Sequence, residues 1–117
     1  MKNCTVNILG SEWSVKFGTV KEYSNLEDMD GYTDASTREI IVDIMEAQQD
    51  AAGSKKDLIK YRMEVLRHEI IHAFLFESGL ASNTMSTDNW AVNEEMVDWF
   101  AIQAPKIFMV FAELEII

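Results

Sequence analysis

The sequence predicts an α+β fold in which a small twisted, antiparallel-rich β-sheet packs on two longer helices and a short carboxy-terminal helix. Two observations carry this prediction. Apolar and polar residues alternate within the first 44 residues, as in half-buried strands, and spacings of three and four replace this alternation after residue 53. A length of 117 residues suits one hydrophobic core, so we expect a single domain over residues 1–117.

The composition is that of an acidic globular protein. Hydrophobic residues make up 48% of the chain and the formal net charge is −10, so the average surface repels nucleic-acid phosphates and anionic lipids. The charge also fits a decoy that mimics DNA, but the acidic residues are scattered. Cys4 is the only cysteine, which excludes an internal disulfide. With no secretory leader and no apolar run of roughly 18 residues, we expect a cytoplasmic protein without nucleic-acid or membrane partners.

Two β-hairpins are predicted in the first half of the chain. The first has apolar residues at alternate positions on both sides of a Gly10–Ser11 step. These residues are Val6, Ile8, Trp13, Val15 and Phe17. The second hairpin combines residues 31–34 with residues 38–44, joined by turn-forming residues. The polar segment between the hairpins, residues 20–29, predicts a loop.

Three helices are predicted in the second half. A helix of about 24 residues starts near Ser54 and Asp57 and ends at Gly79, a favourable carboxy-terminal cap. A second helix is expected from about Asp88 to Pro105, where the missing N–H and the ring clash break or kink a helix. Residues 106–117 are apolar and predict a last short helix that packs on the sheet.

A candidate metal site lies in the first helix, in the sequence HEIIH. His68 and His72 are the only histidines; four residues apart on a helix, they are separated by about 40° and about 6 Å, so both can reach one ion. Two neutral imidazoles suit zinc. Glu69, about 100° round the helix from His68, can accept a proton from a zinc-bound water. The structural alternative is a pair of hydrogen-bonded core histidines, but a glutamate in so apolar a segment requires a partner.

The third protein ligand must be a carboxylate, because the chain has no third histidine. The downstream acidic residues are Glu77, Asp88, Glu94, Glu95, Asp98, Glu113 and Glu115. Glu94 and Asp98 share a helix face, so Glu94 could bind the metal while Asp98 accepts a hydrogen bond from a histidine ring. Glu95 is the alternative ligand. The structural alternative for these acids is a solvated helix start that complements the macrodipole.

The two motifs together resemble the gluzincin metallopeptidases, whose HExxH helix is followed by Asn-Glu-x-x-x-Asp on a later helix. Asn93, Glu94 and Asp98 match this second pattern, and Ala101 is a small residue where the helices would approach. The stretches HEIIHAFLFESGL and NEEMVDWFAIQAPKI are similar to those of small metallopeptidase-like proteins encoded by phages and prophages. More distantly, the chain is similar to the ImmA/IrrE peptidases. The resemblance covers roughly residues 31–107.

The resemblance implies a minimal zincin-like fold with Zn²⁺ held by His68, His72 and Glu94, Glu69 as the catalytic base and Asp98 in support. It implies hydrolysis of a protein or peptide substrate, which pairs with an edge strand from the second hairpin. With no spare histidine, the oxyanion would be stabilised by one of three tyrosines: Tyr23, Tyr32 or Tyr61. The alternative is a catalytically weak or inactive zinc-stabilised interaction protein, in which a group such as Glu77 caps the fourth zinc position.

Overall fold

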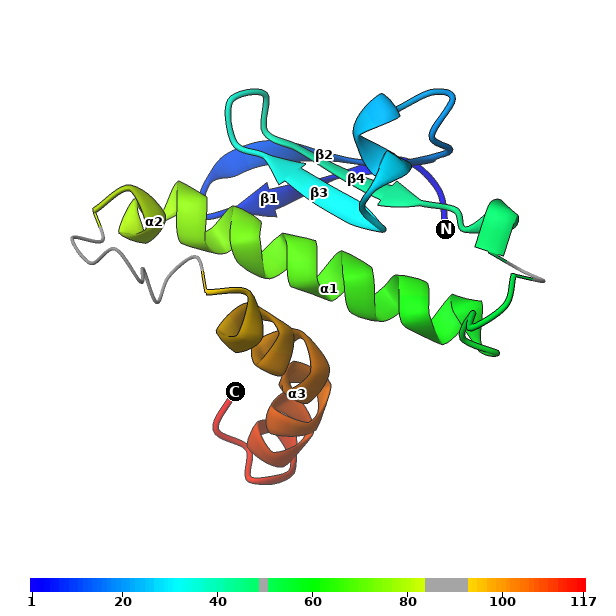
Figure 1. The fold of residues 1–117 in the computed structure, drawn as a ribbon. Helices are drawn as coiled ribbons and strands as arrows, with labels where there is room; N and C mark the ends of the chain where they lie inside the picture. Colours follow the sequence, from blue (N-terminus) through cyan, green and yellow to red (C-terminus); the bar gives the residue numbers. More distant parts are fainter. Residues whose placement is uncertain (49–50, 84–92) are drawn as a thin grey trace.

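The computed structural model describes residues 1–48, 51–83 and 93–117 and shows an α+β fold (Figure 1). The α+β class of the prediction is therefore confirmed. The strands are β1 Cys4–Ile8, β2 Ser11–Gly18, β3 Gly31–Asp34 and β4 Glu39–Asp43, and the α-helices are α1 Leu58–Glu77, α2 Leu80–Asn83 and α3 Glu94–Glu113. Two short 3₁₀ turns are η1 Ser24–Glu27 and η2 Glu46–Gln48. Across these described ranges, no helix has the length and apolar character needed to cross a membrane.

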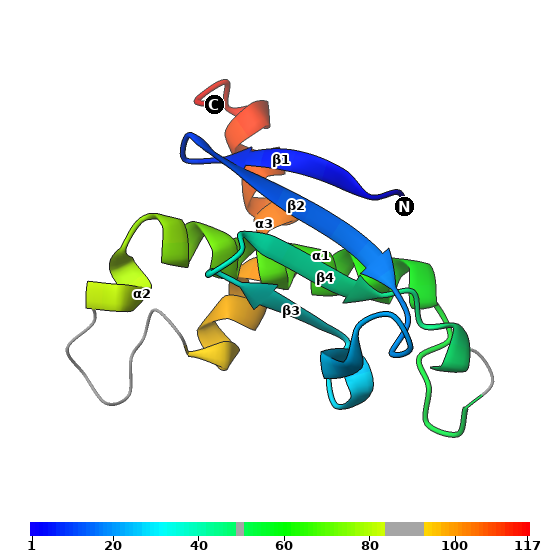
Figure 2. The same cartoon turned by 90° about the horizontal axis from the view of Figure 1, so that it is seen from above.

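The helix α1 is the middle layer of the fold. It packs against β3 and β4 on one side and against α3 on the other (Figures 1 and 2). The core between the sheet and α1 contains Ile8, Trp13, Val15, Ile40, Val42 and Ala73. Because one helix contacts both neighbouring layers, side chains from the sheet and from α3 can meet along α1.

The sheet has the order β1-β2-β4-β3, so β1 and β3 are its edge strands. Both predicted hairpins are confirmed, since β1 pairs with β2 and β3 pairs with β4 in antiparallel fashion. Leu9 and Gly10 both have positive φ, 52° and 91°, as the two-residue type I′ turn of a hairpin requires. The central pair, β2 and β4, is parallel. The sheet is therefore mixed, and the sequence pattern does not predict this pairing.

The strand β3 lies unusually close to α1 at Gly31. A Cβ atom at this position would lie 2.8 Å from Cγ1 of Val65 on α1 and 3.0 Å from the backbone oxygen of Ile41 on β4. The Val65 contact limits the approach of β3 to α1, and the Ile41 contact, which is to a backbone atom that cannot easily move aside, limits its approach to β4. A side chain at position 31 would therefore displace β3 from both neighbours.

The helix α1 begins later than the sequence predicts. Asp57 is the N-cap and accepts a hydrogen bond from the Lys60 N–H, so the helix has 20 residues rather than about 24. Ser54 lies outside the helix. The predicted end is confirmed, because Gly79 has φ +82° and its N–H donates to the Phe76 carbonyl.

The helix α3 differs from prediction at both ends. Asn93 has extended backbone and caps the helix by accepting from the Met96 N–H, so α3 starts at Glu94. The predicted start, Asp88, lies outside the described residues. The helix continues through Pro105 to Glu113, so the separate terminal helix is wrong. Its last turns do not pack on the sheet: Phe108, Met109 and Val110 are each more than half exposed.

A hydrogen bond from α1 explains how α3 passes through Pro105. Proline has no N–H to donate to the carbonyl four residues earlier, that of Ala101. Ala101 is only 1% exposed, so this carbonyl has little access to water, and an unsatisfied buried acceptor costs about 1–3 kcal/mol. Nε of Arg67 on α1 donates to this oxygen at 2.5 Å. A contact between helices thus replaces the bond that proline removes.

The far end of α1 is fastened to the sheet by Glu77. Its carboxylate accepts hydrogen bonds from Arg38 at 3.0 and 3.2 Å, from the Ser11 hydroxyl and from Nε1 of Trp13 at 3.1 Å. Led by the Arg38 contact, these donors lower the pKa of Glu77 to about 2. The carboxylate therefore joins both hairpins to the last turn of α1.

The Glu77 contacts predict a pH-dependent contribution to stability. The pKa of Glu77 is about 2 in the folded protein and near 4.5 in the unfolded chain. The ionised carboxylate therefore stabilises the fold fully above about pH 5. This contribution is lost as the pH falls from 4.5 towards 2. We expect Glu77→Gln to lower the free energy of unfolding at pH 7, with a smaller difference from wild type at pH 3, measured by urea denaturation. Glu12→Gln, an exposed change on the first hairpin, is the control. A difference in free energy of unfolding between wild type and Glu77→Gln that does not change with pH would contradict this role of Glu77.

Candidate metal centre

His68, His72 and Glu94 converge where the first turn of α3 meets α1. The two Nε2 atoms of the histidines are 3.1 Å apart. The Glu94 carboxylate lies 2.9 Å from Nε2 of His68 through Oε2 and 3.1 Å from Nε2 of His72 through Oε1. The structure thus brings together the two predicted histidines and one of the predicted carboxylates.

These separations suit a common ion. Two nitrogen ligands at 2.0–2.1 Å in a tetrahedral arrangement stand about 3.4 Å apart, close to the spacing of the two Nε2 atoms. One ligand atom from each of the three residues can be chosen so that all lie within 4.8 Å of one another. His68, His72 and Glu94 could therefore hold a metal ion.

Asp98 determines which nitrogen of His68 faces the cluster. Its Oδ1 lies 2.6 Å from Nδ1 of His68, so the carboxylate accepts the Nδ1 proton and the lone pair of the neutral ring is at Nε2. That lone pair faces Nε2 of His72 and the carboxylate of Glu94. Acceptors so close together repel one another unless a cation or a shared proton lies between them. The arrangement is therefore one that attracts a cation.

The packing of α3 explains why Glu94 reaches the histidines. Val97 and Ala101 are four residues apart, are fully buried and face α1. Glu94 and Asp98 precede them by three residues each and lie on the adjoining edge of the same face. Glu95, the alternative ligand, is exposed and is not part of the cluster.

Glu69 lies beside the cluster without belonging to it. Its side chain is buried, with 7% exposed, and Oε2 accepts a hydrogen bond of 2.6 Å from the Thr33 hydroxyl on β3. Burial raises the pKa of Glu69, and the Thr33 bond and the two histidines partly offset the rise. No sequence motif marks Thr33 as a partner of Glu69. The available signal was the strand alternation, which places Thr33 on the same face of β3 as Gly31.

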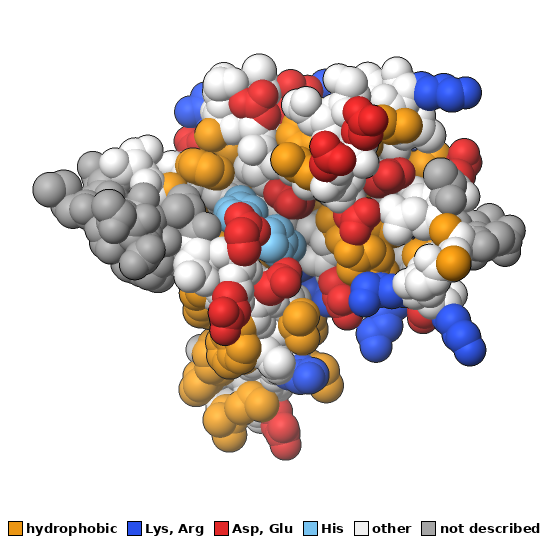
Figure 3. Space-filling view, in the orientation of Figure 1, with side chains coloured by type: hydrophobic (Ala, Val, Ile, Leu, Met, Phe, Trp, Pro, Cys, Tyr) orange, Lys and Arg blue, Asp and Glu red, His pale blue; other side chains and the backbone are white. Residues whose placement is uncertain are grey.

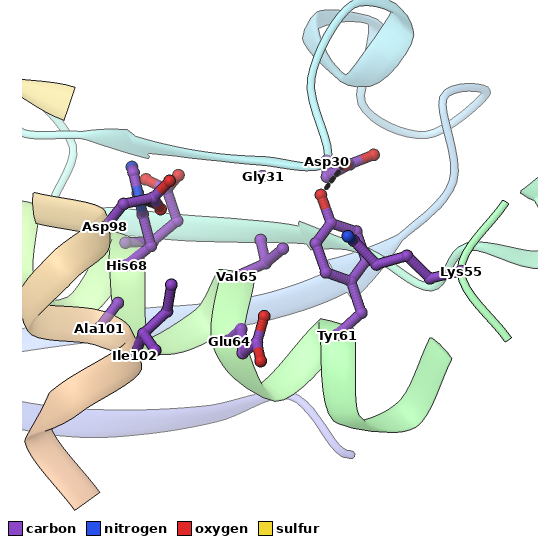
Figure 4. Close-up of a pocket in the computed structure, with 11 residues that line it drawn as sticks. Asp30, Gly31, Lys55, Tyr61, Glu64, Val65, His68, Asp98, Ala101 and Ile102 are labelled. Atoms are coloured by element: carbon purple, nitrogen blue, oxygen red, sulfur yellow. Dashed lines mark hydrogen bonds and ion pairs between the residues drawn. The ribbon is translucent and has the colours of Figure 1, made fainter. Parts of the chain in front are cut away.

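The cluster opens into a groove between β3, α1 and α3. A pocket of about 390 Å³ lies on the side towards the start of α1, with Asp30, Tyr61 and Lys55 at its far end (Figure 4). A second pocket of about 450 Å³ extends towards Phe76 and Glu94. Gly31, His68 and Glu69 line both pockets. Figure 3 shows the two histidines at the surface with acidic side chains around them.

The three tyrosines do not lie at the cluster. Tyr61 donates a hydrogen bond of 2.5 Å to Asp30. It precedes His68 by seven residues, which places it about 10 Å from His68 along the axis of α1. Burial, with the Asp30 contact, raises the pKa of Tyr61 to about 12. Tyr32 contributes to the lining of the second pocket, but it alternates with two residues that face α1, so its side chain points to the other face of the sheet. Tyr23 packs against Gly18 at the end of β2.

Glu77, the residue that could have capped the fourth zinc position, also lies away from the two histidines and Glu94. Its carboxylate is taken up by Ser11, Trp13 and Arg38 at the hairpin end of α1. It therefore does not cap the metal centre.

Comparison with protein-family models, curated proteins and solved structures finds no match for this chain. The gluzincin resemblance consequently stays a prediction from the two motifs, and the chemistry of the site depends on its own geometry.

The geometry predicts which acidic residue of α3 is a metal ligand. Glu94→Gln should abolish stable metal binding, because it removes the one charged ligand that contacts both histidines. Glu95→Gln is the matched control and should bind as wild type does. The measurement is the metal content per chain after dialysis, together with titration by Co²⁺. Loss of binding in Glu95→Gln with retention in Glu94→Gln would show that the ligand has been wrongly assigned.

Proposed function

We propose that this protein is a zinc-dependent metallopeptidase-like hydrolase with a minimal zincin-like fold. The observation that carries the proposal is the convergence of His68, His72 and Glu94 on one point, with the buried carboxylate of Glu69 lining the same pocket. A structural ion pair explains the first feature but not the second. A buried carboxylate beside an ion-binding cluster is the arrangement required for activation of a bound water.

Zinc is the ion that the donor set favours. Two imidazole nitrogens and one carboxylate are the ligand set of many catalytic zinc sites, which keep their fourth position for water or substrate. The Asp98 contact to His68 is the outer hydrogen bond that zinc histidines generally make. Bound there, zinc would lower the pKa of a water to about 7 and polarise a substrate carbonyl.

Glu69 is placed to move the proton. Burial raises the pKa of its carboxyl group, which brings it towards the range in which a carboxylate can both take and return a proton. The Thr33 hydroxyl holds Oε2 at 2.6 Å and so fixes the plane of the carboxylate. Glu69 would accept a proton from the attacking water and pass it to the nitrogen of the leaving amine.

The edge strand β3 is the element that would bind substrate. It pairs with β4 on one side only, and Gly31 and Thr33 line the groove on its α1 side. An extended peptide can add to a free strand edge through backbone hydrogen bonds, which give affinity with little dependence on sequence. Of the two arms of the second hairpin, this supports β3 rather than β4. The proposed substrate is therefore an extended segment of a protein.

One observation favours a second candidate function. Tyr32 and Tyr61 each line one of the two pockets, but the Tyr61 hydroxyl is bonded to Asp30 and the Tyr32 side chain is on the strand face away from α1. The expected side chain for oxyanion stabilisation is therefore not supplied by either in this arrangement. Loss of one such donor typically costs 10²–10³ in rate, or about 3–4 kcal/mol. The alternative is a catalytically weak or inactive interaction protein of phage origin, stabilised by the same zinc.

The role of Glu69 can be tested separately from metal binding. Glu69→Gln should retain zinc, because Glu69 is not a ligand, and should lower hydrolysis by roughly 10²–10⁴-fold through loss of the proton acceptor. The measurement is cleavage of a fluorogenic peptide library by protein loaded with one zinc per chain. Glu95→Gln, with unchanged zinc and unchanged cleavage, is the control.

Two results would contradict the proposal. Undiminished turnover in Glu69→Gln would exclude Glu69 as the base. A zinc-loaded wild-type protein that cleaves no member of the library would favour the interaction protein over the hydrolase.

A further inference from the structure

We infer that Arg67 is a positioning residue for the metal centre, because its hydrogen bond to Ala101 holds α3 where Glu94 and Asp98 can reach the histidines. The inference rests on the proposed zinc site but not on hydrolysis. It concerns a residue that neither binds the metal nor contacts the Glu69 carboxylate. Its basis is the exchange of one hydrogen bond for another at Pro105.

The hydrogen bond between Arg67 and Ala101 lies in the same short stretch of each helix as the proposed metal ligands. Arg67 directly precedes His68 on α1, and Ala101 follows Asp98 by three residues, less than one turn of α3. Figure 4 shows Asp98 and Ala101 on the side of α3 that faces His68. A shift of α3 that broke the bond between Arg67 and Ala101 would therefore also move Asp98 and, one turn further, Glu94.

The other contacts between α3 and α1 at this point are apolar packing and the bonds of Asp98 and Glu94 to the histidines. The buried residues of α3 are Val97 and Ala101, both small. The side chains of Glu94 and Asp98 are 70% and 65% exposed, so packing does not hold them. The 2.5 Å bond from Nε of Arg67 is directional and ends on a backbone atom, which fixes the position of α3 along α1 more strictly than two small apolar side chains do.

Pro105 makes the bond specific to this place. In an uninterrupted helix the Ala101 carbonyl would accept from the N–H of residue 105, and an arginine would gain little by reaching it. Because residue 105 is proline, the carbonyl is available only to a donor from outside the helix. Arg67 supplies that donor. Replacement of Pro105 by alanine should restore the internal bond and satisfy the carbonyl without joining α3 to α1, so this change separates satisfaction of the carbonyl from the contact between the helices.

The test is a double-mutant cycle read out by zinc affinity. Arg67→Met keeps the aliphatic stem without the donor and should weaken zinc binding roughly tenfold, the lower end of effects from residues outside the ligand shell. Pro105→Ala alone should bind within about twofold of wild type. The double variant Arg67→Met/Pro105→Ala satisfies the carbonyl but lacks the bond between the helices, so it should stay roughly tenfold weaker than wild type. Affinity is measured by competition with a chromogenic chelator, and folding by far-ultraviolet circular dichroism.

Arg62→Met is the matched control. Arg62 lies five residues earlier on α1 and donates from Nη1 to the Ile44 carbonyl at 3.1 Å, beyond the end of β4. The same substitution there removes a bond to the sheet layer instead of α3. It should leave zinc affinity unchanged within about twofold, whatever its effect on stability.

The outcomes separate this inference from the proposed function. Wild-type protein that binds no zinc contradicts the proposed function itself. Wild-type binding with an unchanged affinity in Arg67→Met, or with full recovery in the double variant, overturns the role of Arg67 alone. If Arg67→Met does not fold, a double variant that folds and binds zinc roughly tenfold more weakly than wild type supports the inference, and wild-type affinity in the double variant overturns it.

Discussion

The close approach of β3 to α1 is the constraint on which the rest of the site depends. It exists because residue 31 is glycine, since a Cβ there would lie 2.8 Å from Cγ1 of Val65 on α1. The approach brings the Thr33 hydroxyl to Glu69 and makes an edge strand one wall of the groove. If β3 were displaced by the thickness of a methyl group, Glu69 would lose its hydrogen bond from Thr33. The groove would also lose the β3 edge that is proposed to bind substrate. The absence of a side chain at position 31 thus allows the sheet to contact Glu69 on α1.

The metal-free site works against the stability of the fold. A buried carboxylate with a raised pKa and three acceptors converging on one point are each unfavourable unless a proton or a cation lies between the charged or acceptor atoms. A bound metal removes the second penalty and, through its charge, reduces the first. Binding to the folded state alone would then stabilise the protein by about 2.7 kcal/mol when the free metal is at 100 times its dissociation constant. The strain is placed in the middle layer, where the sheet and α3 both hold α1.

Local patterns predict much of this molecule, and non-local contacts account for the rest. The hairpins and the pair of histidines follow from spacings of two and four residues, which a sequence displays directly. The parallel pairing of β2 with β4 joins segments over 20 residues apart and leaves no local signal. Pro105 shows the limit most clearly: the rule that proline ends a helix is sound for an isolated helix, but Arg67 supplies a donor from another helix. Thr33 was missed for the same reason, because its partner Glu69 lies 36 residues away.

The position of Glu77 bears on whether a bound metal would do chemistry. A zinc held only for stability has its fourth position filled by the protein, whereas a catalytic zinc leaves it open. Glu77 was the acidic residue considered for that closing role, but three donors hold it at the hairpin end of α1 and keep its pKa near 2. On the other side of the cluster, glycine at position 31 leaves the groove unfilled beside Glu69. The Glu77 contacts and the glycine at position 31 thus leave space beside the three possible ligands, as an open fourth position would require.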